Sequence, residues 1–308
     1  MFDGRLAERA LTPQERYARE LDALLAQVGR LEEQAVRRAL ALLTEARRRI
    51  VARLAEVPEG AFLASWLPRL QAEIERAMRG YAVQYGRYLD EQAREMFGLA
   101  ARTVGGPLKA AGLALRLPGL DPNLLDILQG FRAGLVTGVA DDAIRAMTTE
   151  LQLGALGGLS PFQLQRRVAD ILRTQPNAAG VFGTVASRAE AITRTELNRA
   201  FNLASEASNQ QLVQAAEQTF PEWRPRKRWL NAGDARVRPA HRRAELLVQR
   251  PLMDGGEFVL VDEKGQSHKA RHPLDARLPA SLSVKCRCRV ILDYQDEGFQ
   301  ALLAREAA

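Results

Sequence analysis

The sequence predicts an α+β protein, in which a mainly helical N-terminal region precedes a compact α+β unit with a small antiparallel sheet. The 308 residues are 46% hydrophobic and 26% charged, a composition typical of globular proteins. Apolar residues recur at helical spacing over much of the first 220 positions, whereas short strand-like runs and turns alternate after Trp223. We expect a helical region over 1–153 and a second unit over 154–308, with helices in 160–220 and strands in 221–293.

The first helix is expected to begin at Pro13 and to end before Pro58, because proline is favoured at the first position of a helix and disfavoured inside it. One apolar stripe extends along it and shifts by one position at Val36, as in a long straight helix packed in a bundle. Its members are Tyr17, Leu21, Leu24, Val28, Leu31, Ala35, Val36, Ala39, Leu43, Ala46, Ile50 and Leu54.

Glycine and proline divide the rest of the chain into further elements. Gly105, Gly106 and Pro107 are expected to end the second helix, and Ser160 is expected to cap the fourth. Helices are predicted over Leu67–Arg102, from Pro122 to about Leu153, over Pro161–Leu172, over Thr184–Thr219 and around Pro239–Leu247. Strands are predicted over Lys227–Leu230, Glu257–Val261 and Arg287–Leu292, with the second in a hairpin.

The positive charge is concentrated in one segment. The chain carries a formal net charge of +7, and residues 221–250 hold nine basic and three acidic residues, a local balance of +6. Such a segment is typical of a surface that contacts nucleic acid or an acidic protein, and a solvated surface with internal ion pairs is the alternative. The patch residues are Arg224, Arg226, Lys227, Arg228, Arg236, Arg238, Arg242 and Arg243.

Several classes of protein do not fit this sequence. No run of about eighteen uncharged apolar residues predicts a membrane span, and the N-terminus has no apolar segment typical of a secretory signal. Cys286 and Cys288 are too close in sequence for an ordinary disulfide. No phosphate-binding loop of the Gly-x-x-x-x-Gly-Lys-Ser/Thr type is present, which argues against a packaging motor.

Two stretches of sequence together are distinctive. The first, on the predicted helix 184–219, contains Arg188, Ile192, Arg194, Thr195, Glu196, Arg199, Ala200 and Asn202. The second contains Trp229, Asp234, Arg236, Arg238 and His241, followed by a hairpin, Pro273 and finally Cys286-Arg287-Cys288-Arg289. Their order and spacing over residues 155–293 resemble the phage Mu F-like minor head proteins, also called SPP1 gp7-like head morphogenesis proteins.

The resemblance implies a structural, non-enzymatic component of a tailed-phage head that lies near the portal. It would act in head assembly and in genome packaging or delivery, in the host cytoplasm during assembly and then in the procapsid or virion head. The implied partners are the portal protein, other head proteins and phage DNA, with no membrane and no small-molecule substrate. Two departures concern the hairpin: Lys285 stands where the family often has Asn, and Asp254-Gly255 comes later than usual.

Chemistry alone leaves other interpretations open for the motif residues. Glu196 lies in an apolar stripe, so it needs an ionic partner, for which Arg199 and Arg194 are near enough on the same helix. The motif residues expected to have structural roles are Arg194, Glu196, Arg199, Asn202, Trp229, Asp234, His241, Cys286 and Cys288. The alternative function is a nuclease-like or toxin-like enzyme, or a non-enzymatic basic DNA-binding module. The enzyme would use His241 as general base with Arg236, Arg238 and Glu196.

We expect no cofactor and no bound metal. Zinc is the alternative, because thiolate, imidazole and carboxylate groups are its usual ligands. The candidate ligands would be Cys286, Cys288, His241 and Asp234.

Overall fold

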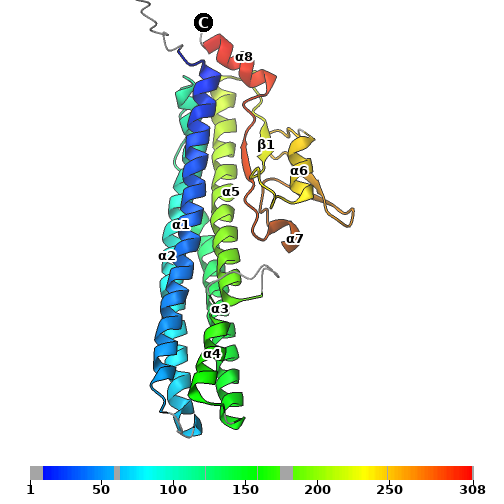
Figure 1. The fold of residues 1–308 in the computed structure, drawn as a ribbon. Helices are drawn as coiled ribbons and strands as arrows, with labels where there is room; N and C mark the ends of the chain where they lie inside the picture. Colours follow the sequence, from blue (N-terminus) through cyan, green and yellow to red (C-terminus); the bar gives the residue numbers. More distant parts are fainter. Residues whose placement is uncertain are drawn as a thin grey trace, which may run out of the picture.

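The computed structural model describes residues 10–58, 63–121, 123–157, 159–173, 183–247 and 249–306. Helices α1 to α5 form an elongated bundle, and a smaller α+β unit lies beside α5 in its upper half (Figure 1). The predicted fold class, α+β and mainly helical, is confirmed. The bundle helices are α1 (Pro13–Ala55), α2 (Leu63–Ala110), α3 (Asn123–Leu156), α4 (Pro161–Ile171) and α5 (Val185–Thr219). Within the described ranges, no helix combines the length and the apolar character that crossing a membrane requires.

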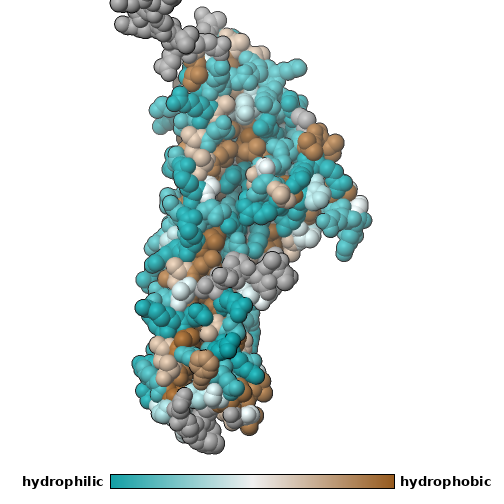
Figure 2. All heavy atoms as spheres, viewed as in Figure 1, coloured by the Kyte–Doolittle hydropathy of each residue, from teal (hydrophilic) through white to brown (hydrophobic). Residues whose placement is uncertain are grey.

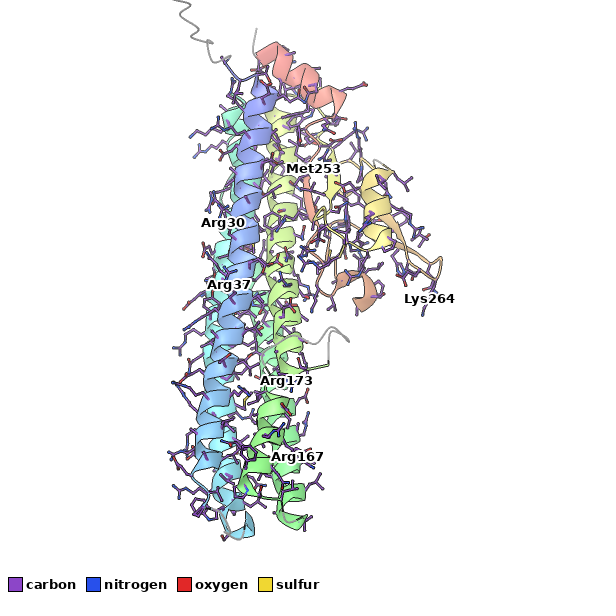
Figure 3. The ribbon with its side chains drawn as sticks, viewed as in Figure 1. Arg30, Arg37, Arg167, Arg173, Met253 and Lys264 are labelled. Atoms are coloured by element: carbon purple, nitrogen blue, oxygen red, sulfur yellow. The ribbon has the colours of Figure 1, made fainter. Side chains whose placement is uncertain are left out.

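The stripe predicted for the first helix is buried along its whole length. Every member from Tyr17 to Leu54 is buried, including those after the shift at Val36. The helix begins with a capping box, in which the Thr12 hydroxyl accepts from the Glu15 backbone amide and the Glu15 carboxylate accepts from that of Thr12. Arg30 and Arg37 point away from the bundle on the opposite side (Figure 3). The helix therefore has one face in the core and one basic face in solvent, and hydrophilic residues cover most of the face of the molecule seen in Figure 2.

Helix α2 is longer than predicted. It continues through Gly105, Gly106 and Pro107 to Ala110, although these residues were expected to end it. Proline lacks an amide hydrogen, so near the end of a helix it removes a single internal hydrogen bond. A Cβ atom at Gly106 would lie 3.3 Å from Leu24 Cδ1. Glycine at this position therefore serves the close approach of α1 and α2, and it does not break the helix.

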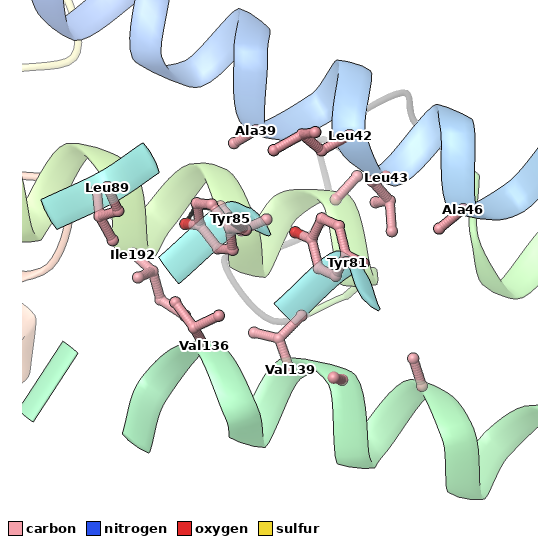
Figure 4. Close-up of a cluster of buried hydrophobic side chains, with 14 of the residues drawn as sticks. Ala39, Leu42, Leu43, Ala46, Tyr81, Tyr85, Leu89, Val136, Val139 and Ile192 are labelled. Carbon is pink, nitrogen blue, oxygen red and sulfur yellow. Dashed lines mark hydrogen bonds between the residues drawn. The ribbon is translucent and has the colours of Figure 1, made fainter. Parts of the chain in front are cut away.

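Two stacked tyrosines occupy the middle of the bundle (Figure 4). The rings of Tyr81 and Tyr85 lie 5.5 Å apart, between Leu43 of α1 and Val139 of α3. The Tyr85 hydroxyl donates to the Ala189 carbonyl at 2.9 Å, so a fully buried polar group is satisfied by α5. These contacts show the tyrosines in a packing role.

One hydrophobic cluster spans the boundary predicted at 153/154. Leu164 of α4 and Leu197 of α5 belong to the same cluster as Leu43 of α1. A second cluster joins Tyr17 of α1 to Phe299 of the C-terminal helix, with ring centroids 5.3 Å apart. The predicted boundary is therefore not a division of the hydrophobic core, and α5 belongs to the bundle.

The α+β unit contains two separate antiparallel ribbons among its described residues. Strand β1 pairs with β4, with Lys227 opposite Leu292, and β2 pairs with β3, with Phe258 opposite Ala270. The small sheet expected from the sequence is thus divided in two. The elements of this part are β1 (Lys227–Leu230), α6 (Pro239–Leu246), β2 (Phe258–Val261), β3 (Ser267–Ala270), α7 (Ala280–Ser283), β4 (Arg289–Leu292) and α8 (Glu297–Glu306).

Replacing Leu197 with alanine tests the shared core. The side chain is fully buried, so we expect the free energy of unfolding to fall by about 2–5 kcal/mol. Because α5 packs on α1 and α2, native-state hydrogen exchange should speed up in those helices as well. Leu156, which is 87% exposed, provides the matched control, and Leu156→Ala should change stability by less than about 0.5 kcal/mol. Unchanged exchange in α1 and α2 for Leu197→Ala would show that the two regions fold independently.

Candidate functional site

The candidate site is the joint at which the α+β unit meets α5. Strand β4 pairs with β1 along one edge, and side chains of α5 bond to the backbone of its other edge. Asn202 donates from Nδ2 to the Cys288 carbonyl at 3.1 Å and accepts from the Val290 amide at 3.0 Å. Asn202 is fully buried, so these bonds are shielded from water. The asparagine side chain therefore takes the place of a further strand.

The turn before the two cysteines is fixed in the same way. The Lys285 amide donates to Thr195 Oγ1 on α5 at 2.9 Å, and the Lys285 ammonium pairs with Glu190 at 3.1 Å. Lys285 has φ of +58°, in the left-handed region that asparagine tolerates better than lysine. This explains physically why asparagine suits the position just before Cys-x-Cys, and why lysine there needs contacts with α5.

Arg194 links α5 to α1 by a buried ionic network. Its guanidinium donates to Glu32 at 2.5 Å, to Glu33 at 2.8 Å and to Glu190 at 2.9 Å. Burial alone would lower the pKa of Arg194, but these three carboxylates raise it, Glu33 most. Glu32 is 2% exposed and also accepts from Asn198 at 2.9 Å. The motif residue Arg194 therefore joins two helices of the bundle.

Glu196 faces the inside of the bundle. It is 1% exposed and pairs with Arg199 on the same helix, as the sequence predicts. Burial raises the pKa of Glu196, and Arg199 and Arg132 oppose that rise. Among the described residues, no hydrogen bond or ion pair joins it to His241. The catalytic alternative that combined these two residues therefore has no direct bond between them to support it.

A buried ion pair that the sequence analysis missed attaches β1 to α5. The Lys227 ammonium lies 3.1 Å from both carboxylate oxygens of Glu206. Lys227 is completely buried, so its assignment to an exposed basic patch is wrong. Desolvation lowers the pKa of Lys227 and outweighs the attraction of Glu206. The sequence held a sign that Glu206 faces the α+β unit, because Glu206 lies four residues after the motif residue Asn202 and therefore on the same face of the helix.

His241 and the two cysteines meet in the core of the α+β unit. Nδ1 of His241 lies 3.4 Å from Cys288 Sγ and 3.5 Å from Cys286 Sγ. All three residues are at most 2% exposed, and the ring of Trp229 packs edge-on against the imidazole at 5.2 Å. The hydrogen bond between the thiols lowers the pKa of Cys286 and, with burial, raises that of Cys288. The imidazole is out of contact with solvent, which does not suit a general base acting on a large substrate.

Asp234 does not join this cluster, so the fourth ligand proposed for the zinc alternative is wrong. Both of its carboxylate oxygens accept from Arg287 at 2.7 Å, and Arg236 donates to it at 3.0 Å. These bonds, that from Arg287 above all, lower the pKa of Asp234 to about 2. Arg287 lies between the two cysteines in sequence, and its side chain holds Asp234 in this ion pair.

The other patch residues divide into paired and unpaired groups. Arg226 lies near Asp296 at 3.6 Å, and Arg236 pairs with Asp234. Arg228 stacks on Tyr294 with its guanidinium 5.3 Å from the ring centroid, and Arg238 donates to the Val284 carbonyl. The exposed arginines of this patch with no carboxylate partner among the described residues are Arg224, Arg242 and Arg243, which bond to backbone carbonyls. The usable basic surface is therefore smaller than the sequence predicts.

In comparisons with known proteins, no family model, no curated protein and no solved structure matches the chain.

The Lys227–Glu206 pair gives a sharp test of how the unit is attached to α5. Lys227→Ala leaves a buried carboxylate without its partner, so we expect a loss of about 3–5 kcal/mol in urea unfolding. The double variant Lys227→Met, Glu206→Leu removes both charges and should recover most of that loss. The exposed pair of Arg48 with Glu45 is the control, and Arg48→Ala should cost under about 1 kcal/mol. Equal effects of Lys227→Ala and Arg48→Ala would contradict a structural role for the buried pair.

Proposed function

We propose that this protein is a structural minor head protein of a tailed bacteriophage, which acts in head assembly near the portal and in genome packaging or delivery. One observation carries the proposal: the residues on which the resemblance rests are used in contacts that hold the bundle and the α+β unit together. Arg194 and Asn202 of α5, His241 of α6 and the Cys286–Cys288 segment all make their contacts within the chain. Their roles are architectural, as expected of an assembly component.

A joint made of buried polar contacts suits a protein that binds one partner with each of its two parts. The helical bundle is elongated, and the α+β unit is attached to its helix α5 by buried polar contacts (Figure 1). Exposed arginines occur on both parts, with Arg30, Arg37 and Arg38 on α1 and Arg242 and Arg243 on α6. Acidic surfaces of head proteins, or DNA, are the chemical complement of these positions. We assign the portal contact to α1 and the DNA contact to the α+β unit.

The enzyme alternative has less support from the site. His241 and Glu196 are both buried and lie in different clusters, and Arg236 is paired with Asp234. A basic DNA-binding module remains compatible with Arg224, Arg242 and Arg243, and the experiment below separates it from a head protein.

The test is sedimentation of the full chain with procapsids assembled from head genes of the same genome. We expect the wild-type chain to co-sediment with nuclease-treated, empty procapsids. Charge reversal of Arg30, Arg37 and Arg38 to Glu should reduce co-sedimentation by about tenfold or more, because like charges across an interface repel. The matched control reverses Arg224, Arg242 and Arg243 and should leave binding to empty particles intact.

Absence of wild-type protein from the procapsid fraction would overturn the proposal. Association that depends on DNA and is lost after nuclease treatment would favour the DNA-binding module. Loss of binding only in the Arg224, Arg242 and Arg243 variant would move the portal contact to the α+β unit.

A further inference from the structure

Three metal-ligating atoms point to one spot in the interior of the α+β unit. His241 Nδ1, Cys286 Sγ and Cys288 Sγ all lie within 4.8 Å of one another. Four ligands arranged tetrahedrally around zinc at about 2.0–2.3 Å are about 3.3–3.8 Å apart. The distances of 3.4 and 3.5 Å from the imidazole nitrogen to the two sulfur atoms fall in this range. The two nitrogen–sulfur separations are therefore those that a tetrahedral ion requires, and the two sulfur atoms lie within 4.8 Å of each other.

Without a metal, hydrogen bonds can join the three groups only in pairs. A neutral imidazole offers one acceptor nitrogen, and here both thiols approach that same Nδ1. Only one S–H group can donate to the single lone pair at a time, so the other thiol is left with the hydrogen bond between the two thiols. A cation at the centre would accept a lone pair from all three atoms together.

The ligands are held in place before any ion binds. The Cys286 amide donates to the Ser283 carbonyl at 3.0 Å, and the Cys288 carbonyl accepts from Asn202 on α5. His241 sits in the first turn of α6, where its amide donates to the Arg238 carbonyl at 3.0 Å. Little ordering remains to be done on binding, which favours affinity.

We propose that His241, Cys286 and Cys288 form a structural binding site for a soft divalent cation of the zinc class. The ligands are Nδ1 of His241 and the two thiolates, and each thiol releases its proton to solvent as its bond to the metal forms. Asp234 is held by Arg287, so a solvent molecule or other small ligand completes the coordination. The proposal is independent of the assignment as a head protein.

The ion would connect α6 to the segment before β4. Both ribbons of this unit have strands of only four residues, and its cluster of buried side chains is small. Small units with short strands commonly rely on a metal or a disulfide for stability. The burial of all three ligands favours a structural role for the ion.

The experiment measures metal binding by the reduced, full-length chain after removal of bound metal. We expect about one Co²⁺ or Zn²⁺ per chain, with thiolate-to-cobalt charge-transfer absorption in the near ultraviolet that zinc abolishes by displacement. Cys286→Ser, Cys288→Ser and His241→Gln should each weaken binding by about 100-fold or more. Matched controls are His268→Gln, a histidine of the β3 strand, and Asp234→Asn, and both should bind like the wild type.

A second measurement uses only the wild-type chain, in case the cysteine variants fail to fold. Zinc should raise its melting temperature, a chelator should reverse the rise, and the bound ion should slow alkylation of both cysteines. A reduced, folded wild-type chain that takes up neither metal and shows no thiolate-to-cobalt absorption would overturn the proposal. Loss of binding in Asp234→Asn equal to that in Cys286→Ser would overturn the three-residue ligand set.

Discussion

The carboxylate of Glu32 is buried between α1 and α5, and its need for partners determines how the parts of this protein are placed. An ionised carboxylate in the interior is costly unless charged groups and hydrogen-bond donors surround it. Arg194 and Asn198 of α5 supply donors, and the guanidinium of Arg289 on β4 lies 3.9 Å away. A slip of α5 along α1 would break this set. The network therefore specifies one register for the bundle and the strand that lies against it.

Helix α5 carries this constraint to the α+β unit because it is buried on two sides. Leu197 packs in the bundle, while Thr195, Asn202 and Glu206 face the unit and contact Lys285, β4 and β1. Their spacings of seven and four residues place the three on one face of the helix. Polar residues in a buried stripe give directional contacts, which apolar packing lacks. The bundle and the α+β unit are thus joined in a defined orientation.

Local sequence patterns predicted most of the helices and strands, but they could not predict which residues distant in sequence contact one another. The stripe of α1, strand β1 and the Glu196–Arg199 pair follow from spacing and capping alone. The burial of Glu32 was not predicted, although Glu32 lies four residues after Val28, on the apolar side of the helix. The sequence of α1 alone does not show that α5 supplies the partners that make a buried charge tolerable there. The sequence analysis expected no metal, and its zinc alternative grouped His241 and the two cysteines with Asp234. It could not foresee that Asp234 pairs with Arg287, because that pairing depends on which way the Arg287 side chain points. The glycines near the end of α2 were expected to end the helix. The role of Gly106 in packing could not be predicted, because it depends on the contact of α2 with α1.

Scanning calorimetry of the intact chain tests this account most directly. If α5 is shared by the bundle and the α+β unit through buried contacts, neither part can melt while the other stays folded. We predict one transition, with a calorimetric enthalpy equal to the van't Hoff enthalpy within error. Two resolved transitions, or a calorimetric enthalpy about twice the van't Hoff value, would contradict the claim that the buried network unites the two parts.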